Sequence, residues 1–291
     1  MNDHKPSPLN RTIRLDDDDL ALQIPQLDPA ELLSNVYQAD VLDALDIFPS
    51  EHFDLIVADP PYNYGIDFGN DSDKRSDTEY REWAREWVQK LTRVSKPSAS
   101  FYICSGWEYS GFYQQELEAA GLNIVNRITW KRDKGRGASR NWKSNMEDVW
   151  FAVRDKKNYT FNLDQVKVRK PVIAPYRENG IPKDWTVDED GKPFRMTHPS
   201  NIWTDLTVPF WSMRENTPHP TQKPEALAER IILASSNPGN RVLDLFSGSG
   251  TFSVVAKKLG REFIGIEMNP EYIRYALKRL ATLDKEPNLT L

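Results

Sequence analysis

The sequence contains a single cysteine and four histidines among 291 residues. The cysteine, Cys104, lies in an apolar run (SFYICSG), so it has no partner for an internal disulfide and is expected to be packed rather than reactive. Four histidines without paired cysteines do not match the ligand spacing of a structural zinc site, and we expect no metal. With 39% hydrophobic residues, the chain is instead long enough for one large core that carries a smaller insertion.

Long hydrophobic runs are also missing. No apolar run approaches the length needed to cross a bilayer, and the N-terminal residues MNDHKPSPLNRTIRL lack the apolar segment of a secretion signal. We therefore expect a cytoplasmic protein with no membrane partner.

Basic residues are scarce at the start of the chain. Residues 1–50 carry ten acids and three bases, a net charge of −7, which leaves the remainder of the chain at +2. Residues 1–35 are polar, include four consecutive aspartates and show little periodicity, which predicts a flexible acidic arm. Such an arm could also fold over the core or a partner.

One basic run stands out in the rest of the chain. Residues 131–143 (KRDKGRGASRNWK) include six bases and one acid. The interleaved glycines and tryptophan favour a mobile loop that contacts phosphates. A solvated charged surface is the commoner explanation of such a run, and the sequence leaves both open.

From residue 36 onward, short apolar runs alternate with amphipathic ones. This alternation predicts an α/β fold in which a mostly parallel sheet is covered by helices on both faces. The predicted strands are 36–38, 53–58, 99–105, 122–130, 147–153, 241–246 and 262–267, and the predicted helices are 78–94, 108–120, 224–235, 251–259 and 270–283.

One region breaks the alternation. Residues 162–218 hold seven prolines and three tryptophans but few long apolar runs. This composition predicts a small irregular lobe inserted between two halves of one sheet, residues 36–161 and 219–291. A disordered linker is the alternative, but the aromatic content favours a segment that becomes ordered on contact.

The second half contains a predicted nucleoside-binding turn. Residues 241–250 (RVLDLFSGSG) read as a strand that runs into a glycine-rich turn, and a helix follows. Glycines let the backbone approach a ligand closely, and the helix start offers free N–H donors. Glu267 ends the next predicted strand, 19 residues after Gly248, which suits a carboxylate that binds both ribose hydroxyls. An acid at a helix start is the simpler explanation, and Glu267 can be both.

The turn lacks the third glycine of a dinucleotide-binding fingerprint, because Thr, Phe, Ser and Val follow Gly250. This absence disfavours a nicotinamide-dependent oxidoreductase. The pattern that begins at Phe246 (Phe-x-Gly-x-Gly) is typical of S-adenosylmethionine (AdoMet) methyltransferases, whose cofactor has no phosphate.

The stretch LIVADPPYNYG places Asp59, Pro60, Pro61 and Tyr62 at the end of a predicted buried strand. If this strand neighbours that of the glycine turn, the four residues face the cofactor. An exocyclic amino group is a poor nucleophile, and its lone pair is freed when Asp59 and the Pro60 carbonyl accept its two hydrogens. Tyr62 offers a flat surface for a base rotated out of its duplex. A plain strand-ending turn remains the simpler explanation.

In the order of its motifs, the sequence resembles the β class of amino-group DNA methyltransferases. That class has a catalytic Asp-Pro-Pro-Tyr segment, a target-recognition region, a His-Pro-Thr-Gln-Lys-Pro segment and a Phe-x-Gly-x-Gly turn, and residues 36–283 show all four in this order. The resemblance implies a Rossmann-like methyltransferase fold with a seven-stranded sheet and a permuted motif order. Residues 36–161 would form the catalytic half, residues 162–218 the target-recognition lobe and residues 219–291 the AdoMet-binding half.

The resemblance also implies the cofactor residues. Thr221, Gln222 and Lys223 would hold the methionine end of AdoMet, and Lys223 can pair with its α-carboxylate. Asp40 resembles the acidic segment near the cofactor adenine, although a helix N-cap explains it equally well. The full predicted set is Asp40, Asp59, Thr221, Gln222, Lys223, Phe246, Gly248, Ser249, Gly250, Glu267, Met268 and Asn269.

The partner implied by the resemblance is double-stranded DNA, with the protein associated with the nucleoid. Polar groups of the lobe would read base edges, and the basic run would contact phosphates. The polar loop 63–77 is expected to fold over the site when substrate binds. The sequence leaves open whether the protein has a cognate restriction endonuclease or is a solitary methyltransferase, and whether it forms a homodimer. The predicted DNA-contacting residues are Lys131, Lys134, Arg136, Arg140 and Lys143.

The target base follows from a trend in the resembling class. An aspartate at the first motif position goes with adenine N6 and a serine with cytosine N4, so Asp59 favours adenine. Cytosine N4, an RNA substrate and a non-catalytic nucleic-acid-binding subunit are the alternatives. The last is disfavoured, because a subunit without turnover has no chemical need of Asp59, Tyr62, Gly248, Gly250 and Glu267 together.

Overall fold

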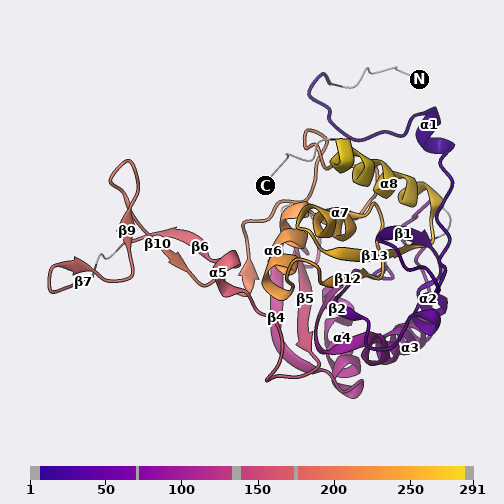
Figure 1. Ribbon diagram of the computed structural model, residues 1–291, viewed down its shortest axis with the longest axis horizontal. Helices are drawn as coiled ribbons and strands as arrows, with labels where there is room; N and C mark the ends of the chain where they lie inside the picture. Colours follow the sequence, from indigo (N-terminus) through magenta and orange to yellow (C-terminus); the bar gives the residue numbers. More distant parts are fainter. Residues whose placement is uncertain (1–6, 70–71, 133–138, 174–175, 286–291) are drawn as a thin grey trace.

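The computed structural model of the chain describes residues 7–69, 72–132, 139–173 and 176–285 (Figure 1). Its main feature is an eight-stranded sheet in the order β1-β13-β12-β2-β3-β5-β4-β11, in which only β5 runs opposite to the other strands. The strands are β1 (Asn35–Gln38), β13 (Glu262–Glu267), β12 (Arg241–Asp244), β2 (Phe53–Ala58), β3 (Ser95–Ser105), β5 (Met146–Val153), β4 (Asn123–Lys131) and β11 (Ile202–Trp203).

Six helices cover the two faces of this sheet. Apolar side chains of α2, α3 and α4 pack on one face, and those of α6, α7 and α8 on the other, so each face has its own buried cluster. The helices are α2 (Val41–Ile47), α3 (Asp77–Val94), α4 (Trp107–Ala119), α6 (Glu225–Ser235), α7 (Thr251–Lys258) and α8 (Pro270–Lys285). Five of these match predicted helices, whereas α2 was foreseen only as the N-cap at Asp40.

The seven predicted strands correspond to β1, β2, β3, β4, β5, β12 and β13. The predicted count of seven is one short, because the two-residue strand β11 adds to the edge beside β4. The segment is short and flanked by polar residues, so it gives no periodic signal. Trp203 nevertheless lies buried there, and the indole N–H of Trp130 donates to the carbonyl of Leu206 at 2.9 Å.

The predicted irregular lobe contains short strands that project from the sheet, at the left of Figure 1. It begins with α5 (Leu163–Val166) and includes an antiparallel sheet in the order β6-β10-β9 and a hairpin of β7 and β8. The prolines at 171 and 193 stand at strand ends, where a missing backbone donor is tolerated. These strands are β6 (Val168–Pro171), β7 (Arg177–Glu178), β8 (Ile181–Pro182), β9 (Thr186–Val187) and β10 (Pro193–Thr197).

The described part of the predicted flexible arm, residues 7–35, is held against the rest of the protein. The backbone N–H groups of Arg11 and Ile13 donate to the carbonyls of Trp211 (2.7 Å) and Asn216 (2.8 Å). The acidic run forms α1 (Asp17–Leu20), and Lys278 of α8 binds Asp16. The structure therefore matches the alternative that the arm folds over the core. The sequence could not decide between the two expectations, because main-chain and ion-pair contacts leave no hydrophobic pattern.

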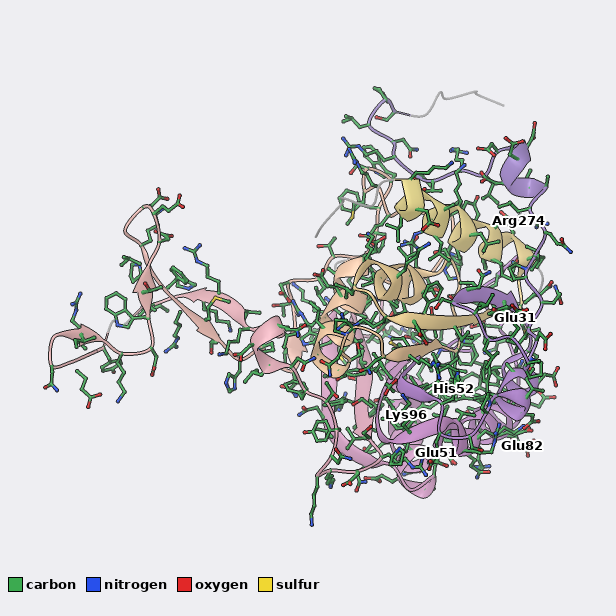
Figure 2. All side chains as sticks on the ribbon, in the orientation of Figure 1. Glu31, Glu51, His52, Glu82, Lys96 and Arg274 are labelled. Carbon is green, nitrogen blue, oxygen red and sulfur yellow. The ribbon has the colours of Figure 1, made fainter. Side chains whose placement is uncertain are left out.

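The two ends of the parallel strands differ in chemistry. Figure 2 shows Glu51, His52 and Lys96 close together at the amino ends of β2 and β3. Lys96 pairs there with Asp54 at 2.8 Å, so these charges neutralise one another on the surface. The pocket described below lies at the other, carboxyl end, where ligands bind in open α/β sheets. None of the helices in the described ranges is long and apolar enough to cross a membrane.

The docking of β11 can be tested through Trp203. We expect Trp203→Ala to lower the free energy of unfolding by about 3–5 kcal/mol in urea denaturation, because it empties a buried aromatic site. The neighbouring Ile202 is 60% exposed, and Ile202→Ala should change stability by only about 0.5 kcal/mol. Equal losses from the two variants would show that Trp203 does not anchor this strand.

Candidate active site

A cavity of about 370 Å³ lies at the carboxyl ends of β2, β12, β13 and β1. Its size is in the range of small-molecule sites, and its lining combines apolar and charged side chains. Asp59, Phe246 and Glu267 all line it, although they come from three different strand ends. The sheet order therefore brings together the motifs that the sequence placed far apart.

The glycine turn forms one wall of this cavity, and its backbone requires glycine. Gly248 and Gly250 have φ angles of +52° and +80°, in the left-handed region. A Cβ on Gly248 would lie 2.8 Å from His219 Nε2, and one on Gly250 would lie 2.6 Å from the Cβ of Ala276. Phe246 packs against Trp83 and Trp87 of α3, which fixes the start of the turn.

Glu267 stands at the end of β13, as predicted. Its carboxylate accepts the backbone N–H groups of Gly248 and Asn269, each at 2.8 Å, so it ties the glycine turn to the start of α8. Burial raises the pKa of Glu267, and these backbone donors oppose that rise. Asn269 in turn donates to the carbonyl of Phe68 at 2.5 Å. Phe68, which follows the Asp59 turn, is thereby connected to the start of α8.

The remaining predicted cofactor residues differ in how they are used. Asp40 and Met268 line the cavity, and Asp40 also caps α2 by accepting the Leu42 N–H at 2.7 Å. Thr221 lines the cavity as well, and its backbone N–H donates to His219 Nδ1 at 3.3 Å. Gln222 also lines the cavity, and its side chain accepts the Thr217 N–H at 2.9 Å and donates to the Glu215 carbonyl at 2.7 Å. Gln222 therefore braces its own loop.

His219 is a partly buried, neutral residue of this wall. Its ring packs on Tyr272 and Phe68 at centroid distances of 4.4 and 5.8 Å. Burial lowers the pKa of His219 to about 3, and the nearby cations Lys223 and Arg279 act in the same direction. The imidazole therefore carries no charge at neutral pH.

Asp59 lies at the centre of a buried charge cluster. The ammonium of Lys223 contacts both of its carboxylate oxygens at 2.6 Å, and the Tyr62 hydroxyl donates to Oδ1 at 2.9 Å. Burial raises the pKa of Asp59, and Lys223 opposes that rise. For Lys223, the carboxylates of Asp59 and Glu147 outweigh burial and raise its pKa overall. In the structure the Lys223 ammonium binds protein carboxylates and Lys223 lines the cavity, so its pairing with the cofactor stays a prediction.

Two residues of this cluster, Glu147 and Arg132, were not predicted as site residues. Glu147, at the start of β5, is 3% exposed and accepts from Tyr62 and from Arg132. It was read only as part of an apolar strand, and Arg132 only as part of the basic run. An acid at the start of an otherwise apolar strand (MEDVWFAV) is the signal that could have found it, because buried carboxylates need partners.

Residues 53–278 match the sequence model of the DNA methylase family. They include Asp59, the charge cluster around it and the glycine turn. The chain belongs to the DNA methylase family.

Curated relatives agree with this assignment. The methylase is 38% identical to the type II methyltransferase M.HpaI of Haemophilus parainfluenzae over 243 residues, which cover 83% of this chain and 72% of the relative. It is 39% identical to the DNA adenine methyltransferase YhdJ of Escherichia coli (strain K12) over 251 residues, which cover 84% and 82% of the two chains.

Solved structures resemble the fold of this methylase. The M1.HpyAVI-SAM complex has a TM-score of 0.60 at 26% identity and covers 84% of this chain and 98% of that one. The cytosine-N4-specific PvuII DNA methyltransferase has a TM-score of 0.61 at 19% identity and covers 84% and 85% of the two chains, which shows the fold alone.

Lys131 is the last residue of β4, and the other predicted DNA-contacting residues come between β4 and β5 in the sequence. Lys131, Arg140 and Lys143 are exposed, whereas Lys134 and Arg136 lie outside the described residues. The backbone N–H of Arg132, just after β4, donates to the carbonyl of Asn145, just before β5, at 2.6 Å. Among the described residues, no group of three or more His, Cys, Asp or Glu side chains could hold a metal ion.

The constraint at Gly250 can be tested. Gly250→Ala should lower the free energy of unfolding of the methylase by about 2–4 kcal/mol, because it adds left-handed strain and an overpacked contact with Ala276. Gly260 is the matched control, since its φ is +73° but a Cβ there meets nothing within 4 Å. Gly260→Ala should cost only about 1–2 kcal/mol. Chemical denaturation of both proteins checks this, and identical losses would contradict the packing argument.

Proposed function

We propose that this DNA methylase transfers the methyl group of S-adenosylmethionine to N6 of an adenine that is rotated out of a specific DNA site. One observation carries the proposal: the carboxylate of Asp59 lines the same cavity as the glycine turn and Glu267. A hydrogen-bond acceptor for an amino group is thereby placed beside a nucleoside-binding wall.

The cavity fits AdoMet as the cofactor. Glu267 supplies acceptors for ribose hydroxyls, and Gly248 lets the backbone approach closely. Ser249 Oγ is buried without a hydrogen-bond partner in the described residues, as expected where a polar ligand completes a site. When bound, AdoMet supplies an electrophilic methyl group on its sulfonium.

The chain's own residues would prepare the target nitrogen. Asp59 accepts one hydrogen of the amino group and the Pro60 carbonyl accepts the other, which favours a pyramidal nitrogen with a free lone pair. The Tyr80 hydroxyl donates to the Pro61 carbonyl at 2.8 Å and so fixes the Pro-Pro turn. Tyr62 would stack on the base, with the Tyr64 ring edge-on behind it at 5.9 Å.

Adenine is the target that the sequence and the relatives favour. Asp59 heads the motif, as in adenine-modifying members of the β class, and YhdJ is named a DNA adenine methyltransferase. Cytosine N4 would need the same two acceptors.

Several finer predictions belong to this proposal. The lobe, residues 162–218, would read base edges, and the exposed Lys131, Arg140 and Lys143 would contact phosphates. The division into an arm, a catalytic half, a lobe and a cofactor half remains our proposed organisation. We also propose that the protein acts with a cognate restriction endonuclease, forms a homodimer and associates with the nucleoid in the cytoplasm.

The central test is mass spectrometry of nucleosides from unmethylated DNA incubated with AdoMet and the purified protein. We expect N6-methyladenine from the wild type. Asp59→Ala should reduce methyl transfer by at least about 100-fold, because the amino group loses its acceptor. Its affinity for AdoMet, measured by calorimetry, should fall by less than about tenfold.

Other outcomes have distinct meanings. N4-methylcytosine would keep the mechanism but overturn the choice of base. An equal loss of AdoMet affinity and methyl transfer in Asp59→Ala would show that Asp59 serves the cofactor. No methylated base on any DNA would contradict the proposed reaction and direct the search to RNA or to a binding role.

A further inference from the structure

Glu147 shares both hydrogen-bond donors of Asp59. The Tyr62 hydroxyl lies 2.9 Å from Asp59 Oδ1 and 3.1 Å from Glu147 Oε2. Lys223 Nζ lies 2.6 Å from both oxygens of Asp59 and 3.3 Å from Glu147 Oε2. Because Tyr62 has one O–H and Lys223 three N–H groups, the two carboxylates divide a fixed number of donors between them.

Arg132 holds Glu147 from the other side. Its guanidinium Nη1 lies 2.5 Å from Glu147 Oε1, and Arg132 also lines the cavity. Arg132 is 30% exposed, whereas Glu147 and Lys223 are 3% and 5% exposed. Asp59, Glu147, Lys223 and Arg132 together have no net charge, so the buried carboxylates are compensated.

The two oxygens of Asp59 differ in their remaining capacity. A carboxylate oxygen accepts about two hydrogen bonds. Among the residues that the structure describes, Oδ1 has two partners, Lys223 and Tyr62, and Oδ2 has one, Lys223. One acceptor position is left, on Oδ2 of a residue that lines the cavity.

We infer that Glu147, held by Arg132, is a positioning residue for methyl transfer. It shares Tyr62 and Lys223 with Asp59, and this sharing leaves Asp59 Oδ2 able to accept a hydrogen of the target amino group. The inference rests on the proposed function. If Glu147 lost its charge, both donors, Lys223 and Tyr62, would bind Asp59 alone. Asp59 would then be a weaker hydrogen-bond acceptor for the amino group.

The inference predicts a pH effect with a definite sign. Asp59 is faced by Tyr62, Lys223, Glu147 of β5, Cys104 of β3, Asp244 of β12 and Tyr113 of α4. Burial and the charge of Glu147 raise the pKa of Asp59, and Lys223 lowers it. Only ionised Asp59 accepts the amino hydrogen, so the rate falls as the pH drops through this pKa. Removing the charge of Glu147 lowers the pKa and moves this acid limb to lower pH.

The experiment is a single-turnover measurement of DNA methylation against pH, with AdoMet and DNA at saturation. For Glu147→Gln we expect the plateau rate to fall by about 10- to 100-fold, as when one hydrogen bond to a charged group is lost. The acid limb should move to lower pH. AdoMet affinity, measured separately by calorimetry, should change by less than about threefold.

Asp148→Asn is the matched control. Asp148 is the next residue of β5, is fully buried and pairs with Arg127 at 2.9 Å, but it is absent from the contacts of Asp59 and from the cavity lining. Successive residues of a strand point to opposite faces. We therefore expect Asp148→Asn to lower thermal stability while the acid limb keeps its wild-type position.

A second variant covers the case in which Glu147→Gln does not fold. Arg132→Gln removes a partly exposed cation that pairs with Glu147. The uncompensated charge of Glu147 then raises the pKa of Asp59, so the acid limb should move to higher pH, opposite to the shift in Glu147→Gln. A wild-type rate and an unmoved acid limb in the folded variants would overturn the role of Glu147. A wild-type protein that methylates no base would instead overturn the proposed function, so the two failures are distinguishable.

Discussion

The buried ammonium of Lys223 is the interaction on which the architecture of the site depends. It joins the end of β2, the start of β5 and the loop before α6, which are far apart in the sequence. A charge removed from water is stabilised only by partners with good geometry, and loss of one partner costs about 3–5 kcal/mol. Lys223 therefore holds together two segments whose carboxylates repel each other, and the cavity wall forms only when the whole sheet is assembled.

The strand order explains how these segments meet. β2 and β12 are hydrogen-bonded neighbours at the centre of the sheet, so the Asp59 turn and the glycine turn emerge side by side. The antiparallel direction of β5 has a second effect, because it places the start of that strand at the same edge as the ends of β2 and β3. Glu147, at the start of β5, thus joins the charge cluster around Asp59, which lies at the end of β2.

The sequence predicted those features whose residue types and hydrophobic periodicity lie together in one short segment. The seven main strands, the Asp59 turn and the glycine turn with Glu267 each carry a local pattern of residues. It failed where the function of a residue depends on distant partners. Glu147 lies in a strand whose apolar pattern hides the contacts that its carboxylate makes with Tyr62 and Arg132. Folding of the arm over the core was one of two expectations, and its backbone contacts with Trp211 and Asn216 leave no sequence pattern that could have decided between them.

The lobe is attached to the end of α6 at its first residue, Asn162, and to the sheet at β11. Asn162 donates to the carbonyls of Leu233 and Ser236 where the lobe departs, and β11 pairs with β4 where it returns. Loop closure depends weakly on length, with about 0.6 kcal/mol for each doubling. The stretch between the two attachments can therefore be lengthened, shortened or replaced with little effect on the folding of the rest. In evolutionary terms the lobe is an exchangeable module, and under the proposed role of the lobe in reading base edges, a lineage could acquire a new recognition sequence while inheriting the chemistry unchanged.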